Sequence, residues 1–313
     1  MLLRHVYSLN VKPVKPYSFD LTASCYAISW EYDGHNAYIT LDYDKHVSLV
    51  KVSPREDELL FEVYADTSSS DIIDSAIRDA RFILGVDEDL TNFYGLCKND
   101  PLLGILAERF IGMRIRAVQN LWQGILISIC QQNASFKQGW KMLLNIRRKL
   151  GKPLQIPNNP RIMFTYPSPR QVIEKFDLLK DCRVGYRDKV ILNAARFFLE
   201  NESEELEKIK GIGQYSARLA RILGLRKYDE FPVDRWFSVL IPKVYANEDK
   251  WTIRRVEEFA VKKWDKWAGL AAVMITVITG AKTLTKLLED IQQGKLSPLP
   301  DEPAPLTLWR YET

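Results

Sequence analysis

The period of the hydrophobic pattern changes near residue 97, and this change is the strongest constraint on the fold. Before it, the segments AYITLDYD (37–44), HVSLVKVS (46–53) and LLFEVYAD (59–66) alternate apolar and polar residues. They are rich in Val, Ile, Tyr and Thr, which is typical of half-buried antiparallel strands. After residue 97, apolar residues recur at three- and four-residue steps almost everywhere, which predicts helices.

One helix is expected to lie across the amino-terminal sheet. The segment DIIDSAIRDARFILG has apolar residues at helical spacing between Asp71, a candidate N-cap, and Gly85, a candidate C-terminal stop. The chain is therefore predicted to be α+β. We expect an antiparallel sheet domain over residues 1–97, an all-helical core over 98–290 and an extended, Pro-rich tail over 291–313.

The length and composition indicate a globular, soluble chain. It has 313 residues, of which 46% are hydrophobic, and no stretch reaches the roughly 18 uncharged apolar residues that a membrane span needs. The start lacks a signal-peptide pattern, so we expect an intracellular protein, in the cytoplasm and nucleoid or in the nucleus, with no membrane partner. The four cysteines are far apart and form no CxxC pair. They predict buried thiols, and we expect no cofactor and no metal site made by side chains.

The charge is divided unevenly along the chain. Residues 1–100 carry 9 Lys and Arg against 17 Asp and Glu, which leaves 35 against 23 for residues 101–313 from the totals of 44 and 40. An acidic first third followed by a basic remainder indicates that the second part meets a polyanion, with nucleic acid as the leading candidate. A solvated basic surface with no partner is the alternative.

A glycine-flanked turn is the most informative short segment. SEELEKIKGIGQYSARLARIL (203–223) predicts two helices joined by a turn that contains Gly211 and Gly213. Glycine tolerates positive φ and lets another backbone approach closely. The helix that starts at Gln214 would expose unpaired N–H groups, an arrangement that binds phosphate. A tight turn between two helices with no ligand would have the same sequence.

An acidic residue follows about twenty residues later. In FPVDRWFSVLIPKVY, Asp234 stands just before an apolar periodic run, where an ordinary helix N-cap would also stand. A turn that grips a backbone and a nearby acid are together what an enzyme needs to hold a DNA strand and to stabilise positive charge on its sugar.

These residues resemble the helix-hairpin-helix DNA glycosylases, whose hallmark is GIG or GVG followed, after a helix, by P-V-D or P-x-D. The resemblance covers most of residues 18–285. It includes Gly112-Met113-Arg114 before a helix, the turn Gln131-Gln132-Asn133, and the segment VGYRDKVILNAARF, which matches a GYR motif of the 8-oxoguanine branch.

The resemblance implies that the target nucleotide is rotated out of the duplex and that a side chain fills the gap. Gln131, Gln132 or Asn133 would be this plug, with Asn133 at the matching wedge position, and Tyr186 and Arg187 would lean on the opposite strand. From the residues alone, QQN after an apolar helix is also what a plain helix end with capping amides looks like.

The family likeness assigns the chemistry to Asp234, which would stabilise the oxocarbenium-like charge and orient the attacking water. Relatives that also cleave the strand have a lysine two residues after the second glycine, where this chain has Tyr215. The resemblance therefore implies a monofunctional enzyme that leaves an abasic site.

The same likeness places a base pocket at Tyr215, Leu219, Ala272 and Thr276, although Leu219 also fits a core position. The last two stand where the 8-oxoguanine branch has its base-reading glutamine and stacking phenylalanine, so both reading groups are missing. Tyr215 resembles the aromatic residue of the alkylpurine branch, which favours 3-methyladenine or 7-methylguanine; 8-oxoguanine is the alternative. We expect a monomer whose partner is double-stranded DNA with damaged bases. A non-catalytic DNA-binding protein remains the rival of another class.

Overall fold

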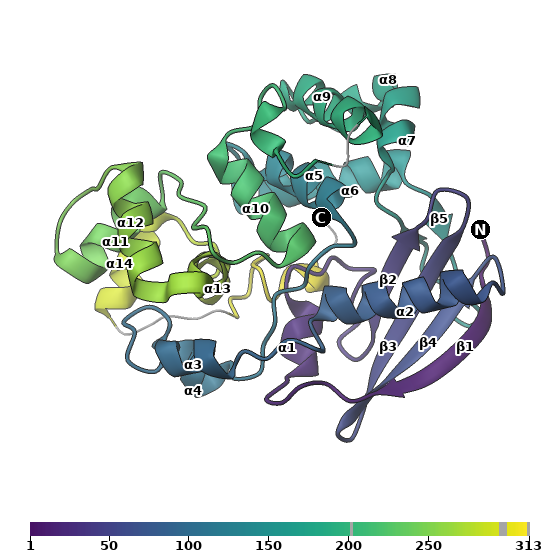
Figure 1. The fold of residues 1–313 in the computed structure, drawn as a ribbon, viewed down its shortest axis with the longest axis horizontal. Coiled ribbons are helices and arrows are strands. Elements are labelled where there is room, and N and C mark those ends of the chain that lie inside the picture. Colours follow the sequence, from purple (N-terminus) through teal and green to yellow (C-terminus); the bar gives the residue numbers. More distant parts are fainter. Residues whose placement is uncertain (201–202, 294–298, 312–313) are drawn as a thin grey trace.

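The computed structural model describes residues 1–200, 203–293 and 299–311, which form three lobes (Figure 1). Each lobe is built around one cluster of buried hydrophobic side chains, and two of these clusters take residues from both halves of the chain. The predicted α+β class is confirmed. Two segments of the expected tail, residues 294–298 and 312–313, lie outside the described residues.

The first lobe is a four-stranded antiparallel sheet covered by a helix. Its strand order is β1, β4, β3, β2, so the three predicted strands are present and a fourth is added at the edge. The elements are β1 (Arg4–Val11), α1 (Phe19–Ser24), β2 (Ala37–Asp42), β3 (Val47–Arg55), β4 (Glu58–Ala65) and α2 (Ser70–Leu84).

Helix α2 ends where the sequence predicts and begins slightly earlier. Gly85 follows it in the left-handed conformation, with φ of 57°, and its N–H bonds the last turn, as a C-terminal glycine stop requires. The N-cap position is held by Ser69, so the expected N-cap at Asp71 is wrong. Asp71 lies in the first turn, where its charge favours the positive end of the helix dipole.

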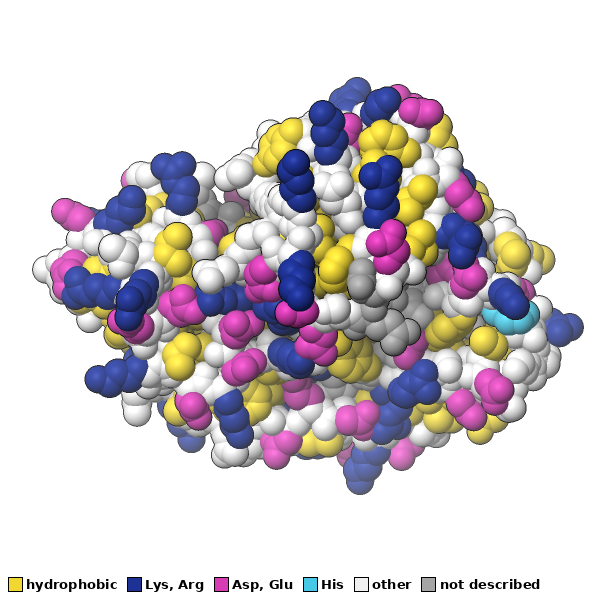
Figure 2. All heavy atoms as spheres, turned by 45° about the horizontal axis from the view of Figure 1, so that its top comes forward, with side chains coloured by type: hydrophobic (Ala, Val, Ile, Leu, Met, Phe, Trp, Pro, Cys, Tyr) yellow, Lys and Arg dark blue, Asp and Glu magenta, His cyan; other side chains and the backbone are white. Residues whose placement is uncertain are grey.

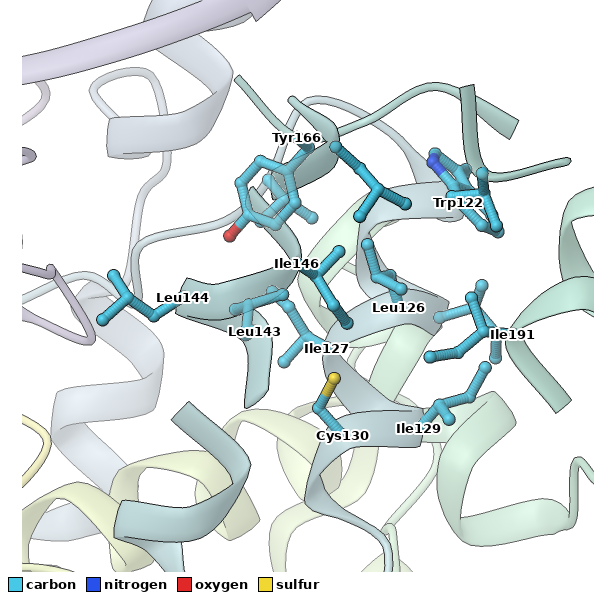
Figure 3. Close-up of a cluster of buried hydrophobic side chains, with 14 of the residues drawn as sticks. Trp122, Leu126, Ile127, Ile129, Cys130, Leu143, Leu144, Ile146, Tyr166 and Ile191 are labelled. Atoms are coloured by element: carbon cyan, nitrogen blue, oxygen red, sulfur yellow. The ribbon is translucent and has the colours of Figure 1, made fainter. Parts of the chain in front are cut away.

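The second lobe is helical and carries the turns that the sequence singled out. Its centre is α5, whose side chains face α6 and α9 in Figure 3. The elements are α5 (Leu121–Gln131), α6 (Phe136–Leu150), β5 (Pro153–Leu154), β6 (Met163–Phe164), α7 (Pro169–Glu174), α8 (Phe176–Lys180), α9 (Arg187–Glu200), η1 (Leu206–Lys208) and α10 (Gln214–Leu225).

Helices α5 and α10 cross in unusually close contact because glycines stand at the crossing. A Cβ atom on Gly124 would lie 2.6 Å from the carbonyl oxygen of Ala220, and one on Gly224 would lie 2.8 Å from Cα of Leu121. Neither position can hold a side chain without moving a backbone. The crossing therefore fixes the end of α5 relative to the start of α10.

The third lobe combines helices from both sides of the expected boundary at residue 97. Phe93 and Tyr94 pack with the carboxy-terminal helices, so α3 shares their core although it precedes that boundary. The elements are α3 (Thr91–Cys97), α4 (Gly104–Arg109), α11 (Phe237–Ala246), α12 (Ile253–Trp264), η2 (Asp265–Trp267), α13 (Ala268–Ile278) and α14 (Leu284–Gln292).

Two segments tie the lobes together. The buried Arg114 of the GMR motif donates to the carbonyl oxygens of Gly112, Val14 and Glu88, so this motif serves as a structural joint. Near the end of the chain, Leu306 packs in the cluster of the third lobe, and Leu308, the first residue of η3 (Leu308–Arg310), packs in that of the second lobe. Within the three described ranges, no helix is long and apolar enough to cross a membrane.

Candidate active site

The glycine turn has one strained glycine and one open glycine. Gly211 has φ of 101°, and a Cβ there would lie 2.7 Å from Cγ2 of Val190, so a side chain is excluded. Gly213 has an ordinary φ of −105°, and a Cβ there would meet no atom within 4 Å. Of the two glycines, only Gly211 uses the positive φ that glycine tolerates. The missing side chain of Gly213 leaves open space beside the backbone.

The helix after the turn begins as predicted, whereas the segment before the turn is shorter than predicted. Only the 3-10 turn η1 precedes Gly211, in place of a full α-helix. The first α-helical bond of α10 is made by the N–H of Ala217, so the N–H groups of Gln214, Tyr215 and Ser216 precede it. Unbonded donors at a helix N-terminus, next to an open glycine, are an arrangement that suits an anion.

Asp234 lies before α11 and contributes to its cap. Its Oδ1 accepts a hydrogen bond of 2.8 Å from the N–H of Phe237, the first residue of α11, although the N-cap position itself is held by Trp236. Burial raises the pKa of the Asp234 carboxyl above its usual range, although the N–H groups of Phe237 and Trp236 act in the opposite direction. A desolvated, fixed carboxylate is the group that can stabilise a developing positive charge.

A cavity of about 390 Å³ brings Asp234 together with every residue of the predicted base pocket. It lies where the three lobes meet, and α10, α13 and the segment before α11 line one side of it. The members of the predicted set that line it are Tyr215, Leu219, Ala272, Thr276 and Asp234.

Tyr215 is close enough to Asp234 to be affected by its charge. Burial first and the Asp234 carboxylate second raise the pKa of the Tyr215 phenol, so this residue is a neutral ring in the cavity. Burial also raises the pKa of Tyr26, and Tyr215 adds to that shift. The two tyrosines, one from each half of the chain, therefore share the same part of the cavity.

The rest of the predicted pocket is mostly apolar. Ala272 is buried, and the hydroxyl of Thr276 donates to its carbonyl oxygen at 3.1 Å, so the hydroxyl hydrogen is already used within α13. Leu219 lines the cavity and also packs against two of the core clusters, so both interpretations of this residue hold.

The QQN turn lies beside the glycine turn and is bonded to it. Nε2 of Gln132 donates to Oγ of Ser216 at 2.7 Å and to the carbonyl oxygen of Gly211 at 3.3 Å. Asn133 is exposed with φ of 46°, and its Nδ2 lies 3.4 Å from the hydroxyl of Tyr186, which is 56% exposed. Asn133 and Tyr186 thus form an exposed pair at the end of α5.

Arg187 does not take the exposed position that the sequence suggested. It is buried and donates to the carbonyl oxygens of Gln132 and Val184. A buried cation needs hydrogen-bond acceptors in place of water, and these two carbonyl oxygens supply them to the guanidinium. The expectation that Arg187 contacts the opposite DNA strand is therefore wrong. Its bond to the carbonyl oxygen of Gln132 instead supports the QQN turn from the protein interior.

Gln131 also turns away from the exposed pair. Its side chain lies against α6, where a Cβ on Gly139 would be 2.4 Å from Gln131 Oε1, and it lines the cavity. This position corrects the expectation of a plug at Gln131 and leaves Asn133 as the exposed residue of the three.

Several cavity residues were missed by sequence reasoning. Tyr26 stacks on Trp140 with ring centres 5.7 Å apart and planes at 19°, and Phe136 packs beside both rings. These residues come from α6 and from the loop after α1, far from the glycine turn in sequence. No local pattern indicates that they would converge there.

One lysine lines the cavity among the described residues, and it was also missed. Lys282 Nζ makes an ion pair of 2.6 Å with Oδ2 of Asp290, and Lys286 pairs with the other oxygen of the same carboxylate. Both members of the first pair are nearly buried. The pairing engages the Lys282 side chain with a carboxylate.

The far end of the cavity reaches the sheet through a buried ion pair. Oε1 of Glu31 lies 2.5 Å from Nη1 of Arg147, whose guanidinium also stacks 4.1 Å above the ring of Tyr166. Burial alone would raise the pKa of Glu31, but Arg147 and Arg116 outweigh it and hold the pKa below its usual range. The Glu31 carboxylate therefore has a structural role, as the partner of the Arg147 guanidinium.

The surface of the second lobe is basic. Figure 2 shows Lys and Arg side chains spread over the upper part of the molecule, where α7 to α10 lie. Exposed basic residues of this lobe include Lys180, Arg183, Lys189, Arg196 and Lys210. Such a surface attracts a phosphate backbone.

Metal-binding side chains do not gather anywhere in the described part of the chain. No group of three or more His, Cys, Asp or Glu residues there could hold a metal ion. The four cysteines, Cys25, Cys97, Cys130 and Cys182, are buried and unpaired with one another, as the spacing predicts.

Comparison with known proteins finds similar sequences and similar folds among DNA glycosylases. No protein-family model matches the chain. A relative from Methanothermobacter thermautotrophicus described as a probable N-glycosylase/DNA lyase is 22% identical over 246 residues, which cover 68% of this chain and 77% of the relative.

Two solved structures share the fold. A 3-methyladenine DNA glycosylase from Archaeoglobus fulgidus matches with a TM-score of 0.71 and 19% identity, over 86% of this chain and 96% of that one. A Clostridium acetobutylicum 8-oxoguanine glycosylase/lyase, bound to double-stranded DNA with cytosine opposite 8-oxoguanine, matches with a TM-score of 0.63 and 19% identity, over 87% and 95%. The resemblance stated from the sequence is confirmed: the relatives and structural neighbours are glycosylases of these types.

Proposed function

We propose that this chain, whose relatives and structural neighbours are helix-hairpin-helix DNA glycosylases, is itself a DNA glycosylase of base-excision repair. It flips a damaged purine out of double-stranded DNA and hydrolyses its N-glycosidic bond, leaving an abasic site. The observation that carries this proposal is a desolvated carboxylate, Asp234, in a cavity next to an open helix N-terminus.

The binding step uses the two turns together. The free N–H groups at the start of α10 hold a phosphate of the strand whose nucleotide is extruded. Asn133 and Tyr186, exposed beside that turn, occupy the gap in the stack, where an amide can pair with the orphaned base and a ring can wedge a base step. The basic surface of the second lobe adds contacts that do not depend on base sequence.

The chemical step uses Asp234. Cleavage of the bond builds positive charge on the deoxyribose, and the carboxylate stabilises it electrostatically from a position fixed by the N–H of Phe237. The same carboxylate orients the attacking water and accepts its proton. Because Asp234 must be ionised for both tasks, its protonation stops the reaction.

Water is the proposed nucleophile because the cavity offers no free amine. Tyr215 stands at the position that would deliver a lysine, and the lysine lining the described cavity, Lys282, is ion-paired with Asp290. Borohydride trapping checks this part separately. We expect no covalent protein–DNA adduct, and an adduct in good yield would show that a lysine attacks the sugar.

The aromatic character of the cavity favours alkylated purines. Tyr215, Tyr26, Phe136 and Trp140 present electron-rich rings, which attract the positive charge of 3-methyladenine and 7-methylguanine. The alternative is 8-oxoguanine, which the exposed pair of Asn133 and Tyr186 and the likeness to an 8-oxoguanine glycosylase/lyase favour. Duplexes carrying each base, with hypoxanthine and uracil for comparison, decide between these substrates through the free base released.

The deciding variant is Asp234→Asn, with Asp229→Asn, an exposed acid five residues earlier, as matched control. We expect Asp234→Asn to lower base release by at least about 10²–10³-fold and to keep DNA binding. Its folded state should be at least as stable at neutral pH, because burial penalises the ionised carboxyl that Asn replaces. Normal turnover by Asp234→Asn, or no base release by the unaltered chain, would favour a non-catalytic DNA-binding protein.

A further inference from the structure

Tyr26 lines the cavity from a strained backbone position. Its φ of 54° lies in the left-handed region, which glycine and asparagine tolerate and a bulky residue rarely adopts. Its N–H donates to the carbonyl oxygen of Pro305 at 2.7 Å, so a distant segment of the chain helps to hold this conformation. Strain of this kind costs folding free energy and is found mainly where function uses it. The side chain that the strained residue presents to the cavity is therefore a candidate for a role there.

The hydroxyl of Tyr26 is free, whereas one face of its ring is occupied. The ring stacks on Trp140 with centres 5.7 Å apart, and the ring of Phe136 lies 6.3 Å away. The hydroxyl makes no hydrogen bond within the described residues, and its oxygen keeps accessible surface. Tyr26 therefore meets the contents of the cavity with its second face and its hydroxyl.

The hydroxyl of Tyr215 is free in the same way. It has no hydrogen-bond partner in the described part of the chain and keeps accessible surface, and the residue stands in the first turn of α10. The charge of Asp234 acts on the Tyr215 phenol, and Tyr215 acts on the phenol of Tyr26, so the three groups share one part of the cavity. Burial raises the pKa of both phenols, so each hydroxyl keeps a hydrogen to donate at neutral pH.

The position of the two hydroxyls beside Asp234 suits contact with the departing base. In the proposed function, Asp234 acts at C1′ of the sugar, and the purine is bonded to that carbon through its N9 atom. Groups next to the carboxylate therefore lie next to the base. A purine offers acceptors to both hydroxyls at its ring nitrogens, and at a keto oxygen where it has one.

The charge of the base decides how much such hydrogen bonds contribute. A cationic, alkylated purine leaves the sugar as a neutral molecule. An uncharged purine such as hypoxanthine takes the electron pair of the C1′–N9 bond with it and becomes an anion. A hydrogen bond to an anion is roughly twice as strong as one to a neutral acceptor, and this gain appears only as the bond breaks.

We propose that the hydroxyls of Tyr26 and Tyr215 donate hydrogen bonds to the departing purine and thereby add uncharged purines to the substrates of this site. This inference rests on the proposed glycosylase function and deepens it. The electron pair of the broken bond goes to the purine, and the oxygen of the attacking water bonds to C1′. The proton that Asp234 accepts from this water passes to the purine anion, while the tyrosines keep their own protons.

The test removes each hydroxyl and keeps its ring, with Tyr26→Phe and Tyr215→Phe. Tyr64→Phe is the matched control, because the hydroxyl of Tyr64 donates to Glu62 within the sheet lobe and Tyr64 does not line the cavity. Single-turnover release of the free base is measured from duplexes that carry hypoxanthine, 8-oxoguanine or 7-methylguanine. Thermal unfolding of each variant is measured alongside.

We expect each of the two variants to lower the release of an uncharged purine by about 10–100-fold, as the loss of one hydrogen bond to an anion predicts. Release of 7-methylguanine should fall by a smaller factor, so the ratio of the two rates should drop by about 10-fold. Thermal unfolding should occur at the same temperature, because neither hydroxyl has a partner within the described residues. Tyr64→Phe should keep both rates.

Four outcomes overturn the inference, and they are distinguishable. If the variants keep the release of uncharged purines, or slow every base by the same factor, the hydroxyls do not act on the charge of the departing base. If the variants lose thermal stability in step with base release, the hydroxyls are structural. If the unaltered chain releases 7-methylguanine but no uncharged purine, the inference fails and the proposed function stands. If it releases no base from any substrate, the proposed function fails and the inference fails with it.

Discussion

The two glycines of the turn should respond in opposite ways to the same substitution. Gly211→Ala places a Cβ 2.7 Å from Val190 at a φ of 101°, where side chains are strained. Backbone strain of about 1–3 kcal/mol and overpacking of about 1–3 kcal/mol together predict a loss of about 2–6 kcal/mol in unfolding free energy. For a chain of this size, each kcal/mol lowers the midpoint of thermal unfolding by about 2–4 °C.

Gly213→Ala should leave the fold nearly unchanged. Its φ of −105° and ψ of 176° suit any residue, and the new methyl group meets no atom within 4 Å. The methyl group does, however, occupy the space beside the N–H groups of Gln214 and Tyr215. If a phosphate docks there, its contact is lost, and the slope of log affinity against log salt concentration should fall by about 0.9.

The assay combines thermal unfolding with fluorescence anisotropy of a labelled duplex at several salt concentrations. Gly185→Ala is the control for backbone strain alone, because Gly185 has φ of 59° and a Cβ there meets no atom within 4 Å. It should destabilise less than Gly211→Ala. The reasoning is refuted if Gly213→Ala binds DNA with unchanged affinity and salt slope, since the open space would then not be a phosphate site.

Further expectations concern pH and the packing around the cavity. Because burial raises the pKa of Asp234, single-turnover base release should fall on acidification while the pH is still above the ordinary Asp value; a constant rate down to about pH 4 would contradict this. Arg147→Met should lower unfolding free energy in urea by about 3–5 kcal/mol by leaving Glu31 buried without its ion pair, and Glu31→Gln in the same chain should recover part of it. Trp309→Ala should cost about 2 kcal/mol by removing an edge contact of 4.9 Å with Tyr32, and an unchanged unfolding curve would show that the end of the chain does not brace the sheet lobe.

The parts of the fold that the sequence predicts are those governed by local periodicity. The strands β2 to β4 and helix α2 follow directly from alternating and helical spacing. Strand β1 was missed, since it is an edge strand with mostly exposed residues and a register shift between His5 and Tyr7. With few buried residues, its sequence carries little of the alternation that marks a strand.

The candidate site was predictable only where a motif fixed it. Asp234 and Tyr215 converge in the cavity as the motif implied, but Tyr26 and Trp140 reach it through tertiary packing of distant elements. Arg187 illustrates the opposite error. A motif gives the position of a side chain along the helix, whereas the backbone carbonyls around it decide whether the side chain is buried or exposed.

The geometry couples the glycine turn and the QQN turn mechanically. The close crossing at Gly124 and Gly224 fixes α5 against α10, and Gln132 bonds the end of one helix to the turn before the other. In the proposed function, a phosphate held at the start of α10 would therefore set the position of Asn133 relative to the same strand. Since neither turn can shift without breaking this contact, the proposed function requires that gripping the backbone and filling the gap occur as one event. Under the same proposal, the rigid unit would leave the extruded base facing Asp234, with little freedom to search for it.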